Sequence, residues 1–262
     1  MKKLILILCI GLLLNSCSSD NSSNNPPSTD TLLVKTITED DGSIISFNYN
    51  GNKLANFSSS NGNIINTLTY DGDLLIKSEI QNPDLTFHLI ATNIYSNNIL
   101  TSATSFAVNT GYSSTRTFTY NSDSSVSELV TDNNDFTDDF MCKRFYSQGN
   151  CVKEEDYSNV NNVMTLSSTK TITYDNKNFY FKSQSGYYGA SIGNLISLNN
   201  EISSITKNAS GIVTKVTNTV YQYNSYDYPI NAVKSTTPYT LTTIGNSVPG
   251  SSTITTESYT YY

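Results

Sequence analysis

The sequence of 262 residues has no tryptophan, a single histidine and four cysteines, and only 14% of its residues are charged. Beyond one apolar run near the amino terminus, no stretch shows the periodicity of an amphipathic helix. A histidine-dependent triad would have to use His88, yet no Gly-x-Ser-x-Gly motif accompanies it. One histidine and no Cys-x-x-Cys pair also argue against a zinc site. We therefore expect no catalytic residue, metal or cofactor, and a protein that is not an enzyme.

Positive charge is also scarce. The formal net charge is −7, and it falls to −9 if Lys2 and Lys3 are removed with a leader, because 13 basic residues then face 22 acidic ones. A protein that binds nucleic acid carries clustered basic residues instead. We therefore expect no nucleic-acid partner.

The one long apolar run has the form of an export signal. Lys2 and Lys3 precede Leu4–Leu14, a run too short to cross a bilayer. It ends in Leu14-Asn15-Ser16-Cys17, which resembles the lipobox of bacterial lipoproteins. The resemblance implies a signal peptide at 1–16, a lipid on Cys17, and anchoring to the outer membrane on its periplasmic or outer side. An ordinary signal peptide is the alternative.

The remaining chain divides into a tether and one domain. Residues 17–34 contain the polar stretch SSDNSSNNPPSTDT, which has no apolar residue able to join a core. Residues 35–262 are enough for one large domain. The 19 tyrosines and the abundant threonine favour strands over helices.

A short motif, an apolar residue before a tyrosine and turn residues after it, recurs through this domain. Its anchoring tyrosines lie 21, 25, 25, 26, 28 and 49 residues apart, and they are Tyr49, Tyr70, Tyr95, Tyr120, Tyr146, Tyr174 and Tyr223. The last gap is close to two periods, which predicts a degenerate copy at 197–202 with Leu198 in place of tyrosine. The domain is thus predicted to hold about eight repeats.

The pattern predicts that each copy is a β-hairpin. In Leu68–Ser78 the Asp71-Gly72 pair suits a two-residue turn, as Asn50-Gly51 does in the first copy, and it predicts that Leu68 faces Leu75. By alternation the residues between the apolar ones point to the opposite face, and they are Thr67, Thr69, Thr117, Thr119, Thr171 and Thr173. One face is therefore predicted to be apolar and the other rich in hydroxyls.

A second reversal must return the chain from each hairpin to the next. Turn-forming residues occur at 41–42, 61–62, 82–84, 109–111, 133–134, 161–162 and 210–211. Two turns per repeat predict about sixteen strands. The expected fold is an all-β antiparallel meander of about eight hairpins, forming a curved extended sheet or one rolled into a half-barrel.

This pattern of tyrosine, Asp or Asn, and a following Gly or Asn resembles the YD repeats of Rhs-type proteins. It resembles more closely the YD-like hairpin-repeat lipoproteins of Gram-negative envelopes, over residues 35–262. The resemblance implies repeated hairpins, with Gly51 and Gly72 as turn residues, and it brings no catalytic residues.

Three features outside the repeat remain. Alternation places His88 with Thr86 and Ile90 on one side of a strand, which predicts a surface residue. Cys142 and Cys151 lie on opposite strands of the fifth hairpin, with Cys151 predicted to face Arg144. They are candidates for a disulfide, although two small buried hydrophobic side chains are the favoured interpretation.

Acidic residues gather at 132–140 and 154–156, in a stretch that fails the EF-hand pattern because Phe136 occupies a ligand position. A solvated turn is the favoured interpretation, and spacing selects no carboxylate pair for glycoside hydrolysis. The insertion at 183–193 carries Tyr187 and Tyr188, which either hold a ligand or, as favoured, cover the apolar face with Phe179 and Phe181.

These features predict a non-enzymatic surface lipoprotein of the outer membrane that binds a protein or glycan or plays a structural role. The second hypothesis is a glycan-binding component of a polysaccharide-uptake system, with Tyr187 and Tyr188 in the site. A hydrolase that uses the 132–156 acids is a distant third.

Overall fold

The computed structural model describes residues 32–133, 139–182, 197–242 and 247–262, and nearly all of its regular structure is β-strand. One short 3₁₀ turn, Asn61–Asn63, interrupts the strands. No helix in these described ranges is long and apolar enough to cross a membrane. The strands are β1 (Val34–Glu39), β2 (Ile44–Asn50), β3 (Lys53–Ser59), β4 (Ile64–Asp71), β5 (Leu74–Gln81), β6 (His88–Ser96), β7 (Ile99–Ala107), β8 (Ser113–Tyr120), β9 (Ser125–Asp132), β10 (Phe140–Ser147), β11 (Asn150–Val160), β12 (Val163–Tyr174), β13 (Glu201–Asn208), β14 (Val213–Tyr223), β15 (Pro229–Leu241), β16 (Ser247–Pro249) and β17 (Thr253–Tyr261).

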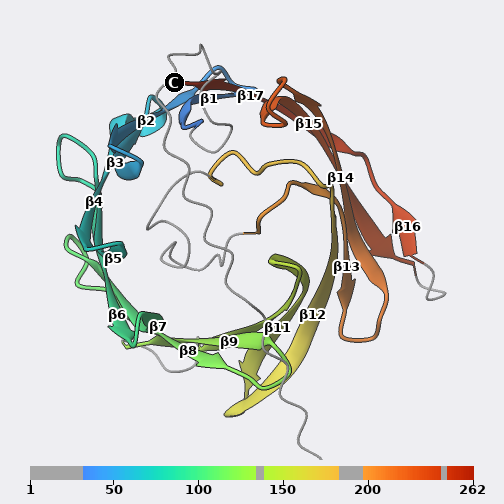
Figure 1. The fold of residues 1–262 in the computed structure, drawn as a ribbon. Helices are drawn as coiled ribbons and strands as arrows, with labels where there is room; N and C mark the ends of the chain where they lie inside the picture. The colour runs from blue at the N-terminus through green and yellow to red at the C-terminus, as the bar shows by residue number, and fades with distance from the viewer. Residues whose placement is uncertain (1–31, 134–138, 183–196, 243–246) are drawn as a thin grey trace, which may run out of the picture.

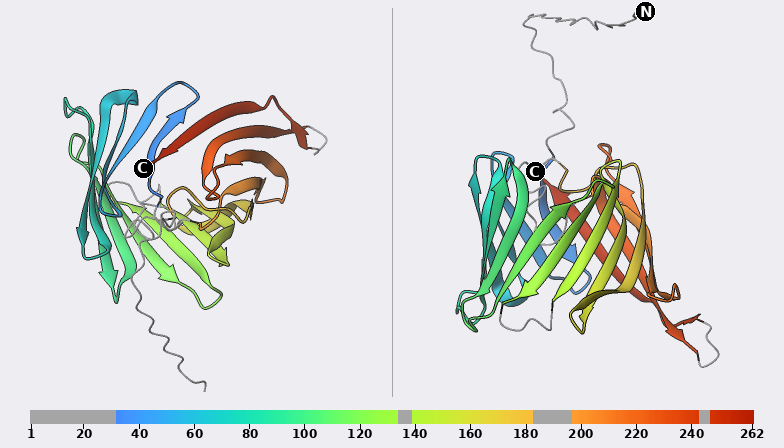
Figure 2. Two further views of the ribbon diagram at one scale, coloured as in Figure 1. Left: turned by 45° about the horizontal axis from the view of Figure 1, so that its top comes forward. Right: turned by 90° about the horizontal axis from the view of Figure 1, so that it is seen from below.

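The strands form a closed antiparallel barrel. Each strand from β1 to β15 pairs with the next along the chain, and the ring closes where β1 pairs with both β2 and β17 (Figure 1). The short β16 pairs with the end of β15, where this hairpin projects beyond the barrel (Figure 2). Sixteen strands thus make the wall, as the repeat predicted. The prediction of a curved sheet or half-barrel was wrong, because the first and last strands meet.

Closure buries the predicted apolar face inside the barrel. Phe47, Leu54, Leu68 and Leu75 are buried there, while all six threonines predicted to point the other way are exposed. An apolar face that would otherwise meet water is the driving force for rolling the sheet up.

The turns after Tyr49 and Tyr70 each lie one residue further along the chain than predicted. In the second hairpin the loop is Gly72-Asp73, closed by the pair Asp71↔Leu74, and Tyr70 rather than Leu68 lies opposite Leu75. A positive φ at the first loop residue, as at Gly72, is typical of a type II′ turn. A register shift just before the tyrosine then compensates, and it recurs before Tyr49, Tyr95, Tyr146, Tyr174 and Tyr223.

The tyrosine hydroxyls bond neighbouring hairpins together. We call the boundary between one hairpin and the next a seam, and the end of the barrel that carries the repeat tyrosines the tyrosine rim. At a seam, the backbone pairing between the two strands stops before it reaches the tyrosine rim. Tyr70 Oη donates to Leu54 O at 2.8 Å, and Leu54 is the residue that pairs with the preceding tyrosine, Tyr49. The same rule holds for Tyr95 on Leu75 O. It also holds for Tyr174 on Cys151 O.

The eighth repeat is made from the two ends of the described chain. Tyr261 of β17 pairs with Val34 of β1, and Tyr49 Oη donates to Val34 O while Tyr261 Oη donates to Pro229 O. The ladder of tyrosines therefore passes through the closure without a break. Both the start of β1 and the end of β17 lie at the tyrosine rim (Figure 2).

The predicted degenerate copy at 197–202 is absent as a hairpin of its own. β12 pairs directly with β13, with Tyr174 opposite Glu201, so residues 175–200 connect the two strands, and this connection starts and ends at the tyrosine rim. Its described parts run inside the ring of strands (Figure 1). Phe181 lies edge-on to Phe47 at 5.3 Å between ring centroids, and Tyr180 lies 5.2 Å from Tyr259. The expectation that Phe179 and Phe181 cover the apolar face is thus confirmed.

We predict that Tyr49→Phe and Tyr70→Phe each lower the free energy of unfolding by about 1–2 kcal/mol, because each leaves a half-buried carbonyl at a seam without its donor. Tyr120→Phe is the matched control, since the hydroxyl of this exposed tyrosine has no hydrogen-bond partner among the described residues. Urea denaturation measures all three. Equal stability of Tyr70→Phe and Tyr120→Phe would contradict the role given to the seam bond.

Candidate functional site

Charged side chains of alternating sign line the inner wall across six neighbouring strands, from β8 to β13. Glu128 lies between two guanidinium groups, with Arg116 Nη1 at 2.9 Å and Arg144 Nη1 at 2.6 Å. Arg144 Nε also reaches Glu154 at 3.3 Å. Lys170 Nζ continues the chain to Glu154 at 3.9 Å and to Glu201 at 3.1 Å. We call these six residues the charge ladder.

The charge ladder is electrically neutral and partly shielded from water. The Glu128 side chain is only 3% exposed and that of Arg144 10%, whereas the outer members are more accessible. Because each carboxylate is paired with one or two cations, the ladder offers no free acid or base, and removal of one member would leave a shielded charge without its partner. Sequence reasoning missed it, although Arg116, Arg144 and Lys170 each stand an even number of residues before a repeat tyrosine, which places them on its face.

The acids at 154–156 are divided between the two faces of the sheet, while Asp135 and Asp138 lie outside the described residues. Glu154 belongs to the charge ladder, and Asp156 accepts a bond from Ser168 Oγ on the inner face. Glu155 points outward and pairs with Lys153 at 2.6 Å. No cluster of metal-binding side chains occurs in the described ranges. Glu154 and Glu155 therefore do not converge on a common site.

His88 is a residue of the outer surface, as alternation predicted. Its Nε2 lies 2.8 Å from Glu79 Oε1, and the other oxygen of Glu79 pairs with Lys77 at 2.6 Å. These groups form a small charged cluster on the outer wall.

Cys142 and Cys151 are both free and buried. Cys142 lies opposite Asp156, and Cys151 lies opposite Tyr146 rather than Arg144 as predicted. Cys142 and Tyr146, the residue opposite Cys151, are four positions apart along β10, which is about 13 Å at 3.3 Å per residue. This is far beyond the reach of a disulfide, so the bridge is absent and the favoured alternative, two buried side chains, holds.

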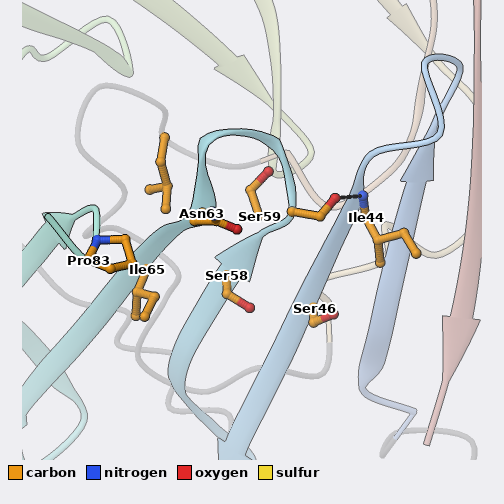
Figure 3. A pocket seen from close by; sticks show the side chains of 9 residues that line it. Ile44, Ser46, Ser58, Ser59, Asn63, Ile65 and Pro83 are labelled. Atoms are coloured by element: carbon orange, nitrogen blue, oxygen red, sulfur yellow. Dashed lines mark hydrogen bonds between the residues drawn. The ribbon is translucent and has the colours of Figure 1, made fainter. Parts of the chain in front are cut away.

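Among the described residues, two pockets lie near opposite ends of the barrel. The first, which we call the far-rim pocket, lies at the rim opposite the tyrosines and has a volume of about 490 Å³; its lining includes Ile44, Ser46, Ser58, Ile65 and Pro83 (Figure 3). The second, which we call the seam pocket, lies at the tyrosine rim between the β10–β11 turn and the end of β12. Its volume is about 430 Å³, and it is lined mostly by amides and hydroxyls. Both are in the size range of small-molecule sites.

Three residues that the sequence singled out fall beyond the described ranges. They are the lipidation candidate Cys17 and the two loop tyrosines, Tyr187 and Tyr188.

Two solved structures resemble this barrel. A porin-like protein from Bacteroides vulgatus ATCC 8482 aligns with a TM-score of 0.53 at 12% identity, over 88% of this chain and 99% of that chain. A porin-like protein from Bacteroides uniformis ATCC 8492 aligns with a TM-score of 0.52 at 14% identity, over 90% of this chain and 98% of that chain. No protein-family model matches the sequence, and no curated protein matches it. At this identity the likeness is one of fold.

We predict that Glu128→Gln lowers the free energy of unfolding by about 3 kcal/mol, because it leaves Arg116 and Arg144 without their shared carboxylate in the barrel interior. Lys77→Gln removes an outer pair with Glu79 and is expected to cost less than about 1 kcal/mol. Thermal and urea denaturation of both variants measure the difference. Equal losses would show that the interior ladder is no better shielded than the outer wall.

We predict that both buried thiols resist alkylation in the folded protein. Burial raises the pKa of Cys142 to about 12 and that of Cys151 to about 11. At pH 8 the thiolate, which is the reactive form, is therefore scarce. Iodoacetamide at pH 8 should label neither cysteine in native protein and both in urea, as read by mass spectrometry of the peptides. A pair that stays unlabelled in urea until a reductant is added would instead indicate a disulfide.

Proposed function

We propose that this protein is a lipid-anchored barrel of the outer membrane that stands in water on its tether and has a binding role without catalysis. The lipid on Cys17 and the tether at 17–34 are part of the proposal, and the Leu14-Asn15-Ser16-Cys17 motif supports them. We also propose that the protein is related to the YD-repeat lipoproteins, because hairpin turns follow repeat tyrosines such as Tyr49 and Tyr70. Porin-like neighbours support the outer-membrane location.

The polarity of the wall is the observation that carries this proposal. Transmembrane barrels turn an apolar band and aromatic girdles toward lipid. Here the outward positions are rich in threonine, and the Lys77–Glu79 and Lys153–Glu155 pairs lie on them. A lysine at the centre of a bilayer costs about 2–4 kcal/mol in a barrel. Apolar residues such as Ile94 occur among the threonines, but the packed apolar cluster is inside.

The position of the chain ends gives the barrel an orientation. β1 begins at Val34 on the tyrosine rim, so the tether joins the barrel at that end. The connection that follows Tyr174 starts at the same end, and its residue Phe181 packs on Phe47 inside the barrel. The far rim, with its pocket and the projecting β15–β16 hairpin, is then the end that points away from the membrane (Figure 2).

A glycan-binding role is the second candidate, and the seam pocket is the observation that favours it. Its lining by Asn, Gln, Ser and Thr suits a ligand rich in hydroxyl groups. The hydrolase hypothesis gains no support, because Glu154 is held by cations and Glu155 lies on the other face.

Fractionation of cells that express wild-type protein and Cys17→Ala tests the proposal. The wild-type chain should sediment with the outer membrane, whereas Cys17→Ala should be released as a folded, water-soluble protein without detergent. As the matched control, Cys142→Ala should remain in the membrane fraction, because it leaves the lipidation motif intact. Retention of Cys17→Ala in the outer membrane, extractable only with detergent, would mean that the barrel itself spans the bilayer.

A further inference from the structure

The seam pocket exists because the connection between β12 and β13 keeps two strands apart. The ladder between β11 and β12 ends at the pair Lys153↔Thr171. Closer to the tyrosine rim, β11 bonds to the connection instead, since Cys151 N donates to Ser197 Oγ at 3.0 Å. The opening left between the strands is the pocket of about 430 Å³.

Two amides of the lining are unused. Gln148 and Asn176 are exposed, and their side chains make no hydrogen bond to any other residue of the described ranges. The pocket also contains a fixed pair: Asn150 Nδ2 donates to Asn199 Oδ1 at 2.9 Å, and Asn199 N donates to Asn150 Oδ1 at 3.0 Å. The pocket thus combines adaptable amides with preorganised ones, which lowers the entropic cost of binding.

The lining has little free charge. Asp175 is its one ionisable acid, and its carboxylate already accepts bonds from Lys177 N, Asn200 N and Tyr223 Oη. Val152 and Ile172 add aliphatic surface beside the amides. Neutral donors and acceptors next to a small apolar wall match a molecule with several hydroxyl groups and an exposed C–H face. An anionic ligand would find no lysine or arginine in the lining to balance its charge.

The backbone at Gln148 is unusual among the tyrosine turns. The φ of Gln148 is +51°. At the corresponding position of three other turns, the residues with a positive φ are Gly51, Gly72 and Asn97. For a residue with a long side chain, this positive φ costs about 1–2 kcal/mol of conformational free energy. The sequence therefore keeps a long amide over the seam pocket at the expense of turn stability, as strained functional residues do.

We infer that the seam pocket binds a neutral saccharide, with Gln148 and Asn176 hydrogen-bonding its hydroxyl groups and Val152 and Ile172 against its C–H face. This inference rests on the proposed binding role and specifies its ligand. The site lies at the end of the barrel that carries the tether.

The test is a binding measurement with the full-length protein in detergent, on an array of neutral glucans, mannans and galactans, with polygalacturonate as the charged comparison. Wild-type protein should bind at least one neutral glycan and not the charged one. Gln148→Gly and Asn176→Ala should each weaken that binding at least tenfold. Because glycine suits a positive φ, Gln148→Gly should melt no lower than wild type, which separates lost contacts from lost folding.

Ser58→Ala, in the far-rim pocket, is the matched control and should bind as wild type does. Loss of binding in Ser58→Ala with full binding in Gln148→Gly and Asn176→Ala would move the site to the far rim and overturn the inference. So would an array with no neutral glycan signal, or with polygalacturonate as the sole ligand. None of these results affects fractionation of Cys17→Ala, so a failure here is distinct from a failure of the proposed anchoring.

Discussion

The hydrogen bond from a tyrosine hydroxyl to a carbonyl of the neighbouring hairpin is the interaction on which this barrel depends. Toward the tyrosine rim adjacent hairpins diverge, and carbonyls such as Leu54 O would be left without a donor in a half-buried place. An unsatisfied buried carbonyl costs about 1–3 kcal/mol. A tyrosine solves two problems at once, because its ring packs inside the barrel while its hydroxyl crosses the seam.

The register shift before each tyrosine belongs to the same arrangement. A bulge bends its strand and changes the direction of the side chain beside it. In the hairpins of Tyr70 and Tyr95 the shift falls just before the residue that reaches across. The hairpin of Tyr120 has no such shift, and this tyrosine is also one whose hydroxyl has no described partner. Turn, bulge and seam bond therefore act as one unit.

Much of this fold could be predicted from the sequence, because each repeat is recognisable from residues that are close together in the chain. Tyrosine spacing and turn residues predicted the hairpins and sixteen strands, and the alternation of threonine predicted the outer wall. The turn at Gly72 was predicted one residue too early, because glycine and aspartate suit the loop positions of both type I′ and type II′ turns. The closure of β1 on β17 joins residues more than 200 positions apart, which no local pattern encodes.

The candidate site was far less predictable. The charge ladder requires the correct register of six strands, and one misplaced turn moves each partner. The seam pocket depends on where residues 197–199 lie beside β11, a contact that the repeat itself would not suggest because the connection interrupts it. Sequence reasoning had instead treated Leu198 as a lost tyrosine, since it divided a long gap into equal periods.

A ring of equivalent units has no intrinsic beginning. Since Val34 and Tyr261 lie opposite each other as the paired residues of the other hairpins do, the two ends of the described chain form one of the eight hairpin units. Duplication or loss of a single hairpin would change the circumference by two strands without creating a free edge. The number of hairpins thus sets the circumference of such a barrel. The residues of one hairpin can then change without a change in the circumference.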